Sequence, residues 1–466
     1  MTQTNSSAPS RPVACIVLAA GQGTRMKSSL PKVMHKIAGL PLVTHVIRAC
    51  EGAGAEKIVT IIAPTGMEQV AKTVHPHATA IQQKPLGTGD AAKAGRETLG
   101  QYQGEIIVLF GDAPLVTAAS LQALRQRQVE TGADLVTAGF YPDDPAQHGR
   151  LVVNADGELL ADIEFADATD EQKQIRLCNG GIMLFGPGVL WPLLDRLRDD
   201  NAKHEFYLTD CIALARVSGH KCAVAVLPAD EVPGINNRIE LADAERMLQN
   251  RLRRQAMLAG VTMTDPDSVF LSADTRFGRD VTIGPNVFIG PGVEIGDNVD
   301  IRAFCYLEQA RVEPGALIGP YARLRPGSVV GEEAHVGNFV ELKNAAVAAG
   351  AKVNHLSYIG DAIIGAKANV GAGTITCNYD GYRKHLTEIG AGAFIGSNSA
   401  LVAPVKIGDG AFVAAGSVIT MEVPANTLAV ARGRQTLIGD WVERFHAEQK
   451  ERQSAEKAAK ESDKKD

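Results

Sequence analysis

The sequence has few aromatic side chains, no long apolar run and no closely spaced pair of cysteines among its 466 residues. No stretch approaches the roughly 20 apolar residues that a membrane-spanning helix needs, so we expect no membrane partner. The polar N-terminus lacks an apolar signal core, which argues against export. The seven cysteines form no C-x-x-C pair. We therefore expect reduced thiols and a cytoplasmic location.

Positive charge is not in excess either, because the formal net charge is −6. Nucleic-acid binding usually needs a basic face, so we expect no nucleic-acid partner. A site for an anionic substrate must then use local cations and backbone amides. Glycine is abundant, with 47 residues, which indicates tight backbone geometry. The length itself predicts more than one domain.

Short apolar runs alternate with helical patterns from Val13 to about Leu227. The predicted strands are 13–20, 57–63, 105–112 and 133–140, and the predicted helices are 42–50 and 121–128. Such alternation predicts an α/β domain with a mostly parallel sheet covered by helices. Ligands of such sheets bind beyond the carboxyl ends of the strands, where Gly21 and Asp112 lie.

A helical pattern over 236–260 predicts a connecting helix. After it, an apolar residue followed by glycine recurs every six residues, at Phe277, Ile283, Ile289 and Ile295. This period fits neither an amphipathic helix nor a sandwich. It fits a prism of very short parallel strands with one aliphatic residue per face pointing inward. The repeat therefore predicts a left-handed parallel β-helix.

The first predicted strand ends in a glycine-rich loop that fits neither the Walker spacing nor the dinucleotide fingerprint. Its pattern, L-A-A-G-x-G-T-R-M-x4-P-K from Leu18 to Lys32, resembles the signature of the sugar-nucleotide pyrophosphorylases. Glycines in this loop let backbone amides approach a triphosphate. Arg25 and Lys32 supply positive charge to the phosphates as pyrophosphate leaves.

Further segments match this family in the same order along the chain. The resemblance implies that Gly87 to Ala91, preceded by Gln82, form the base-reading and substrate loop, and that Asp112 and Asn236 hold Mg²⁺. One carboxylate oxygen and one amide oxygen, completed by phosphates and water, suit this ion. The uridylyl-site residues implied by the resemblance are Leu18, Ala19, Ala20, Gly21, Gln82, Gly87, Thr88, Gly111, and, around the sugar, Gly149, Glu164 and Asn179.

One block of the repeat region, 322–385, interrupts the hexapeptide pattern. Two cations, an imidazole and several amides and phenols crowd into it, which resembles a site for a phosphorylated sugar with a proton acceptor. His355 in isolation would be read as a packed histidine. Its setting favours a general base, because imidazole titrates close to neutral pH.

Residues 13–434 together resemble the bacterial family of bifunctional N-acetylglucosamine-1-phosphate uridylyltransferases and glucosamine-1-phosphate acetyltransferases. The resemblance implies acetylation of glucosamine 1-phosphate by acetyl-CoA. N-acetylglucosamine 1-phosphate then reacts with UTP to give UDP-N-acetylglucosamine, a cell-envelope precursor. Arg325 and Lys343 would hold the sugar phosphate and His355 would accept the amino proton. The other implied acetyl-site residues are Tyr358, Asn369, Ala372, Asn378, Tyr379, Ser397, Ala415 and Arg432.

This resemblance also implies an order of domains and an assembly. We expect a disordered segment 1–12, a uridylyltransferase domain 13–237, a helical linker 238–260 and an acetyltransferase β-helix 261–440. The charged tail 441–466 is expected to be a solvated helix or disordered. A homotrimer is expected, with each acetyl site completed by neighbouring chains.

Three positions depart from the commonest family text: Asp90 stands where histidine is usual, Gly180 replaces threonine, and Phe110 replaces tyrosine. A carboxylate at position 90 is unfavourable near phosphates unless it points away. Two alternatives stay open. One is a monofunctional sugar-nucleotide pyrophosphorylase with a regulatory β-helix, and the other is a non-catalytic assembly protein. The block around His355 speaks against the first, and the cation and metal set speaks against the second.

Overall fold

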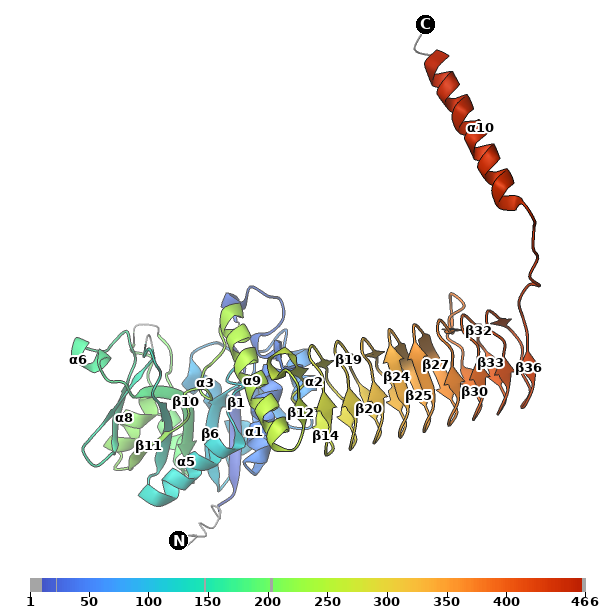
Figure 1. The fold of residues 1–466 in the computed structure, drawn as a ribbon. Helices are drawn as coiled ribbons and strands as arrows, with labels where there is room; N and C mark the ends of the chain where they lie inside the picture. Colours follow the sequence, from blue (N-terminus) through green and yellow to red (C-terminus); the bar gives the residue numbers. More distant parts are fainter. Residues whose placement is uncertain (1–10, 22, 146–147, 202–203, 463–466) are drawn as a thin grey trace.

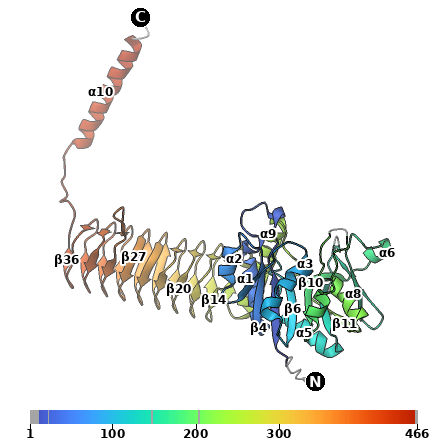
Figure 2. The ribbon, with the colours of Figure 1, turned by 180° about the vertical axis from the view of Figure 1, so that it is seen from behind.

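The computed structural model describes residues 11–21, 23–145, 148–201 and 204–462. Three parts follow one another along the molecule: an α/β domain, a rod of short strands, and a helix that projects from the far end of the rod (Figure 1). Helix α9 lies where the α/β domain meets the rod, and the view from behind shows the same order (Figure 2).

The α/β domain is built on a twisted sheet with the strand order β11-β7-β10-β6-β1-β4-β5. Along this order the pairs are parallel except those of β10, which runs antiparallel to β6 and β7. Beside this path, β8 pairs antiparallel with both β10 and β9. The strands are β1 Val13–Leu18, β4 Ala55–Ile62, β5 Ala78–Ile81, β6 Glu105–Phe110, β7 Leu135–Phe140, β8 Arg150–Val153, β9 Leu159–Ile163, β10 Cys178–Phe185 and β11 Cys222–Val226, with a separate pair β2 Lys36–Ile37 and β3 Leu40–Pro41.

Helices cover both faces of this sheet, and two buried clusters of apolar side chains lie on either side of β1 and β6. The prediction of a mostly parallel sheet is therefore confirmed. The helices are η1 Thr24–Met26, η2 Lys32–Met34, α1 Leu42–Gly52, α2 Glu68–Val74, α3 Thr88–Ala94, α4 Arg96–Leu99, α5 Ala118–Thr131, α6 Asp170–Lys173, α7 Leu190–Leu194 and α8 Asp210–Val217.

The connecting helix expected over 236–260 is α9, Arg238–Leu258, and the side chain of Asn237 caps it by accepting from the Ile239 and Glu240 amides. This helix contacts both neighbouring parts. Its Glu245 carboxylate accepts from the Ala38 amide at 2.7 Å, and its Gln249 amide exchanges two hydrogen bonds with the backbone of Leu271. The α/β domain and the rod therefore meet through one buried polar and apolar contact zone.

The rod is a left-handed parallel β-helix, as the six-residue period predicts. Successive coils pair in parallel, and the repeat residues Ile283, Ile289, Ile295 and Ile301 are buried in its interior. Close inward packing along the whole rod gives one continuous apolar core.

Strands of the rod fall into two sheets. One contains β12 Thr262–Met263, β15 Thr282–Ile283, β18 Asp300–Ile301, β21 Leu317–Ile318, β24 His335–Asn338, β26 Lys352–His355, β28 Asn369–Val370, β31 Phe394–Ile395, β34 Phe412–Val413 and β36 Leu428–Ala429. The other contains β13 Phe270–Leu271, β14 Arg276–Phe277, β16 Phe288–Ile289, β17 Glu294–Ile295, β19 Tyr306–Leu307, β20 Ala310–Val312, β22 Arg323–Leu324, β23 Ser328–Val330, β25 Glu341–Val347, β27 Tyr358–Ile364, β29 Ile375–Cys377, β30 Thr387–Ile389, β32 Ala400–Val402, β33 Val405–Ile407 and β35 Val418–Ile419. A short turn, η3 Pro266–Ser268, lies between β12 and β13.

The two ends of the chain are described to different extents. Of the segment 1–12 expected to be disordered, residues 1–10 lie outside the described residues, and the Pro12 carbonyl accepts from the Glu105 amide. The charged tail forms helix α10, Trp441–Ser462, whose side chains are almost all exposed over 441–458. Among the described residues, no helix combines the length and apolar character that crossing a membrane requires.

Candidate active sites

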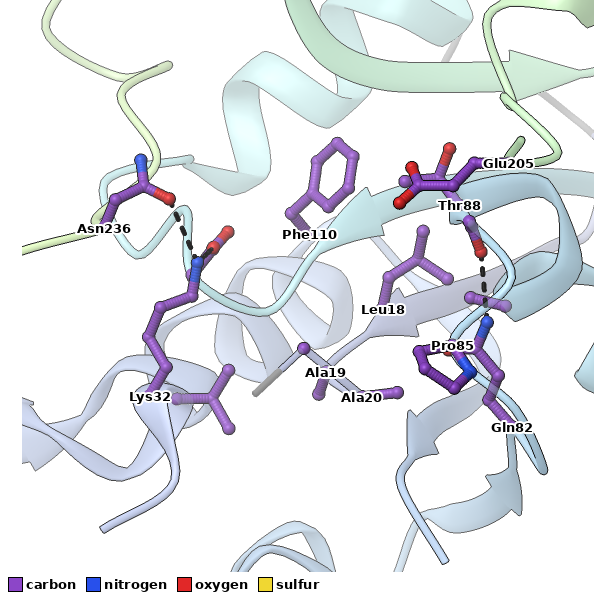
Figure 3. A pocket seen from close by; sticks show the side chains of 15 residues that line it. Leu18, Ala19, Ala20, Lys32, Gln82, Pro85, Thr88, Phe110, Glu205 and Asn236 are labelled. Atoms are coloured by element: carbon purple, nitrogen blue, oxygen red, sulfur yellow. Dashed lines mark hydrogen bonds and ion pairs between the residues drawn. The ribbon is translucent and has the colours of Figure 1, made fainter. Parts of the chain in front are cut away.

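A cavity of about 370 Å³ lies beyond the carboxyl ends of β1 and β6 (Figure 3). Ten residues predicted for uridylyl transfer line it: Leu18, Ala19, Ala20, Gly21, Lys32, Gln82, Gly87, Thr88, Asp112 and Asn236. They come from the end of β1, from the segments that follow β1, β5 and β6, and from the segment that precedes α9. The topology of a parallel sheet thus brings them together, as such sheets do with their ligand sites.

The cations and the expected metal ligands converge at one end of this cavity. The Lys32 ammonium forms an ion pair with the Asp112 carboxylate and donates to Asn236 Oδ1 at 3.3 Å (Figure 3). The Arg25 guanidinium donates to the same amide oxygen at 2.9 Å. Gly23 has a φ of +62°, and a Cβ there would lie 2.6 Å from the Lys32 Cβ, so only glycine lets the loop pack against Lys32.

These contacts bear on whether the residues fit a magnesium ion. The Asp112 and Asn236 oxygens both contact the Lys32 ammonium, so the two oxygens lie within reach of a single cation. Among the described residues, no group of three or more His, Cys, Asp or Glu side chains could hold a metal. A donor set of one carboxylate and one amide suits an ion that takes its remaining ligands from phosphates and water.

The predicted sugar residues lie on the β8–β10 extension and do not line this cavity. The Asn179 amide nitrogen of the backbone donates to the Gly149 carbonyl at 2.9 Å. Its side chain accepts from the Gly181 amide at 2.7 Å and donates to the Asp162 carboxylate. Burial, reinforced by the nearby Glu164, raises the pKa of Asp162 to about 7. Glu164 itself follows β9 and is exposed.

The structure shows what surrounds each of the three departures from the family text. A Cβ at Gly180 would lie 3.0 Å from the Val232 side chain, so a threonine has little room there. Phe110 lines the cavity, and its ring lies about 2.9 Å from where a Gly181 Cβ would be. The Asp90 carboxylate accepts a hydrogen bond from the Gln82 side chain at 2.9 Å, so it has a partner within the protein.

His355 lies at the end of β26 and is exposed. Its Nδ1 is 2.5 Å from the Asn338 Oδ1 on the preceding coil, and the two residues are register partners in β24 and β26. An amide oxygen only accepts, so this contact places the proton on Nδ1. The Nε2 atom is then left with a lone pair that can accept a proton.

The predicted phosphate-binding cations lie on adjacent coils. Because Leu324 and Leu342 are register partners, Arg325 and Lys343 follow them side by side. Arg325 donates to the Glu341 carboxylate at 2.8 Å, which raises the pKa of this arginine. The neighbouring Lys384 lowers the pKa of Lys343. Three cations thus face a small region beside the rod, which favours a doubly charged anion.

Tyr358 and Asn378 lie close together near these cations. A Cβ at Gly360, the register partner of Lys343, would lie 2.5 Å from the Tyr358 hydroxyl and 2.7 Å from the Asn378 Nδ2. The Asn378 side chain donates to the Asp361 carboxylate. Tyr379 is exposed and donates to the Gly381 carbonyl, whereas Asn369 lies on β28 in the other sheet.

The remaining acetyl-site residues form a column along one corner of the rod. The carbonyls of His355, Ala372, Ser397 and Ala415 each accept from the next coil, at 3.3, 2.7, 2.8 and 2.9 Å, and the last donor is the Arg432 guanidinium. The predicted residues therefore follow one another along this corner in chain order, starting at His355.

Several site residues were not found by sequence reasoning. They are Val33, Pro85 and Glu205 in the cavity, Asp162 beside Asn179, and Asn338, Asp361 and Lys384 on the rod. Asn338, Asp361 and Lys384 lie within the block 322–385 that interrupts the repeat, so that interruption was the available signal. The cavity residues carry no sequence signal of their own, because they are ordinary apolar or loop residues.

The fold and the two sites define a class of protein: a nucleotidyltransferase joined to a hexapeptide acyltransferase. Residues 15–207 match the family of the MobA-like NTP transferase domain. Residues 274–309 and 386–420 match the bacterial transferase hexapeptide (six repeats), and residues 306–379 match the GMPPB C-terminal domain.

Similarity to whole proteins extends over nearly the full chain. A Paramagnetospirillum magneticum protein called Bifunctional protein GlmU is 53% identical over 449 residues, which are 96% of this chain and 99% of the relative. Proteins of the same name from Rhodospirillum rubrum (53% identical, 93% of this chain and 97% of the relative) and Sphingopyxis alaskensis (47%, 96% and 99%) are similarly related. The chain belongs to the GlmU family.

Membership of this family confirms the prediction of a bifunctional enzyme with uridylyltransferase and acetyltransferase activities. It speaks against both alternatives, the monofunctional pyrophosphorylase and the non-catalytic assembly protein. Nucleotide and acetyl-CoA substrates accordingly belong to the two domains.

Proposed function

We propose that the two activities use two separate sites, with the residue roles that the sequence predicts. The uridylyl site is the cavity around Lys32, in the domain 13–237. The acetyl site is the corner of the rod around His355, in the domain 261–440, with 238–260 as the linker. The observation that carries this proposal is the convergence of Arg25, Lys32, Asp112 and Asn236 on one point of the cavity wall.

In the acetyl site, the Nε2 of His355 removes a proton from the amino group of glucosamine 1-phosphate. The amino nitrogen of the sugar then attacks the acetyl carbonyl of acetyl-CoA, the C–N bond forms, and the C–S bond breaks. The imidazolium returns its proton to the departing thiolate. Arg325 and Lys343 hold the sugar phosphate throughout, because their charges face one region.

The other acetyl-site residues shape the pocket around these groups. Tyr358, Asn369, Asn378 and Tyr379 border the sugar. The Ala372 amide faces the oxyanion that develops on the acetyl carbonyl. The rest of the corner column, Ser397, Ala415 and Arg432, borders coenzyme A.

In the uridylyl site, a phosphate oxygen of N-acetylglucosamine 1-phosphate attacks the α-phosphorus of UTP. The bond from that phosphorus to the bridging oxygen breaks, pyrophosphate leaves, and UDP-N-acetylglucosamine forms without a covalent enzyme intermediate. Arg25 and Lys32 neutralise the charge that gathers on the departing pyrophosphate. Gly149, Glu164 and Asn179 hold the sugar.

Asp112 and Asn236 would hold Mg²⁺, which supplies charge neutralisation and alignment of the phosphates. The Lys32 ammonium contacts the Asp112 and Asn236 oxygens in this structure, so it is placed to exchange these contacts for one with a phosphate when the substrate binds. The Asn236 amide nitrogen donates to the Gly234 carbonyl at 3.3 Å, which turns the oxygen towards the cations.

We further propose a cytoplasmic homotrimer that makes a cell-envelope precursor. The exposed position of His355 is consistent with a site that neighbouring chains complete.

Two assays on one purified sample test the two-site proposal. Asp112→Ala should abolish pyrophosphate release while thiol release from acetyl-CoA persists, and His355→Ala should do the reverse. The unaffected reaction is the control for folding in each variant. Loss of both reactions in a folded protein would contradict the separation of the sites.

A further inference from the structure

The orientation of one amide in the nucleotide cavity is fixed by the protein. Gln82 lines the cavity, and only 7% of it is exposed. Its Nε2 donates to the Gly87 carbonyl at 3.1 Å and to the Asp90 carboxylate at 2.9 Å. A primary amide has two N–H groups, so both are used.

The group that Gln82 can still offer to a ligand is therefore its Oε1 atom. Within the described ranges, no hydrogen-bond donor is recorded for this oxygen, although the residue is buried. Gln82 lies on the cavity wall beside Pro85, across the end of β1 from Lys32 (Figure 3). A bound nucleotide would thus meet an acceptor at this point and not a donor.

Asp90 is what excludes the opposite orientation. If the amide turned by half a turn, Oε1 would face both the Gly87 carbonyl and the Asp90 carboxylate. Three acceptors would then lie together, one of them charged, with no proton between them. The carboxylate is itself well placed, because Asp90 lies in the first turn of α3, where the helix dipole favours a negative charge.

A fixed acceptor discriminates between pyrimidine bases. The imide edge of uracil presents an N–H between two carbonyl oxygens, whereas cytosine presents an unprotonated ring nitrogen at the same place. Oε1 accepts a hydrogen bond from the uracil N–H and opposes the lone pair of the cytosine nitrogen. A site built to bond one edge rejects the other strongly, because a buried polar group is left unpaired.

We propose that Asp90 is a positioning residue that sets the preference for uracil over cytosine, by holding the Gln82 amide with its oxygen towards the base. This inference rests on the proposed function, in which the cavity around Gln82 receives UTP. It also gives a role to the aspartate that replaces the usual histidine, and that role needs no contact with the phosphates.

The test is the ratio of kcat/KM for UTP to that for CTP, measured by pyrophosphate release with N-acetylglucosamine 1-phosphate. Asp90→Ala should lower this ratio by about tenfold, because the amide is then free to turn. Asp90→Asn is the matched control, since its side-chain oxygen can accept the same hydrogen bond and should keep most of the preference. The ratio for UTP to 5-methyl-UTP should not change, because both bases carry the same imide edge.

The outcomes separate this inference from the proposed function. Wild-type protein that releases no pyrophosphate from UTP would contradict the proposed function. Wild-type protein that uses UTP and CTP equally, or an Asp90→Ala protein that keeps the wild-type ratio, would overturn the inference alone. An equal loss with both nucleotides would also overturn it, because a merely structural role predicts that result. Should Asp90→Ala not fold, Asp90→Glu displaces the carboxylate by one methylene and is judged by the same ratio.

Discussion

Single side chains in both sites act through a partner that fixes them. Asn338 determines which nitrogen of His355 carries the proton, and Asp90 determines which way the Gln82 amide faces. Neither Asn338 nor Asp90 has to contact a substrate in order to affect the reaction. A general base works only if its free lone pair faces the substrate, so the loss of such a partner acts on rate.

The first prediction at this scale concerns Asn338. Asn338→Ala removes the acceptor for the His355 Nδ1 proton, so the ring is free to turn and to change tautomer. We expect the kcat of acetyl transfer to fall by roughly tenfold, with a smaller change in the KM for glucosamine 1-phosphate. Thiol release measures the effect, and unchanged pyrophosphate release from the same sample is the control. An unchanged kcat would show that this contact does not orient the imidazole.

The second prediction concerns the buried carboxyl of Asp162, whose pKa burial raises to about 7. Between its ordinary value and 7, the folded protein holds a proton on this group that the unfolded chain has released. The free energy of unfolding therefore falls as pH rises through this range, and the contribution has been lost above it.

Asp162→Asn should remove that contribution while it keeps an oxygen that accepts from Asn179. We expect the melting temperature of the wild-type protein to fall more between pH 5 and pH 8 than that of the variant. The neighbouring Glu164 and Asp210 are present in both proteins, so the difference reports on position 162. Equal slopes for the two proteins would contradict the raised pKa.

At the scale of elements, the close stacking of the coils fixes the position of the proposed catalytic groups on the rod. Gly337 in β24 shows how little room there is, because a Cβ there would lie 2.1 Å from the Asn354 carbonyl of β26. That atom is backbone and cannot turn away. The next residue along β26 is His355, so a shift of this strand moves the proposed general base.

We therefore predict that Gly337→Ala lowers acetyl transfer by about a hundredfold, the size of loss that a displacement near 1 Å causes. Uridylyl transfer should be unchanged, since β24 belongs to the rod. Gly439→Ala is the matched control, because nothing lies within 4 Å of a Cβ at that position. Thiol release and pyrophosphate release are measured on all three proteins. Full acetyl activity in Gly337→Ala would show that the coils can separate without moving His355.

At the scale of the whole molecule, the α/β domain and the rod divide the chemistry. Within the described parts of both, the pair of oxygens proposed to hold a divalent cation is that of Asp112 and Asn236 in the cavity of the α/β domain. In the proposed acetyl site, the groups around His355 would act by proton transfer and by charge. The two reactions should thus differ in their need for a metal.

Chelation of divalent cations with EDTA should abolish pyrophosphate release and leave thiol release within about twofold of its starting rate. Addition of Mg²⁺ in excess over the chelator should restore the lost reaction, which is the control for damage by the chelator. Loss of thiol release together with pyrophosphate release would contradict the assignment of the metal to the first domain alone.

Much of the fold could be predicted from local patterns, and the exceptions are instructive. The strands expected over 13–20 and 105–112 end at Leu18 and Phe110, because the loops that bind ligands begin directly after the last ladder pair. Strand β10 was not predicted, because the segment around Asn179 was interpreted only as part of the site around the sugar. It lies between β6 and β7 and runs antiparallel to both, and no local pattern indicates this placement.

The sequence by itself determined the rod and predicted the chemical character of both sites, because a six-residue period and a fixed motif are local patterns that can be recognised without knowing how the chain packs. Only the tertiary structure decided which side chains meet. Lys32 and Asn236 are 204 residues apart in the chain yet share a hydrogen bond, and His355 finds its partner Asn338 one coil away. Such contacts depend on how distant segments pack against each other, and this packing is a property of the whole folded molecule and not of any single segment.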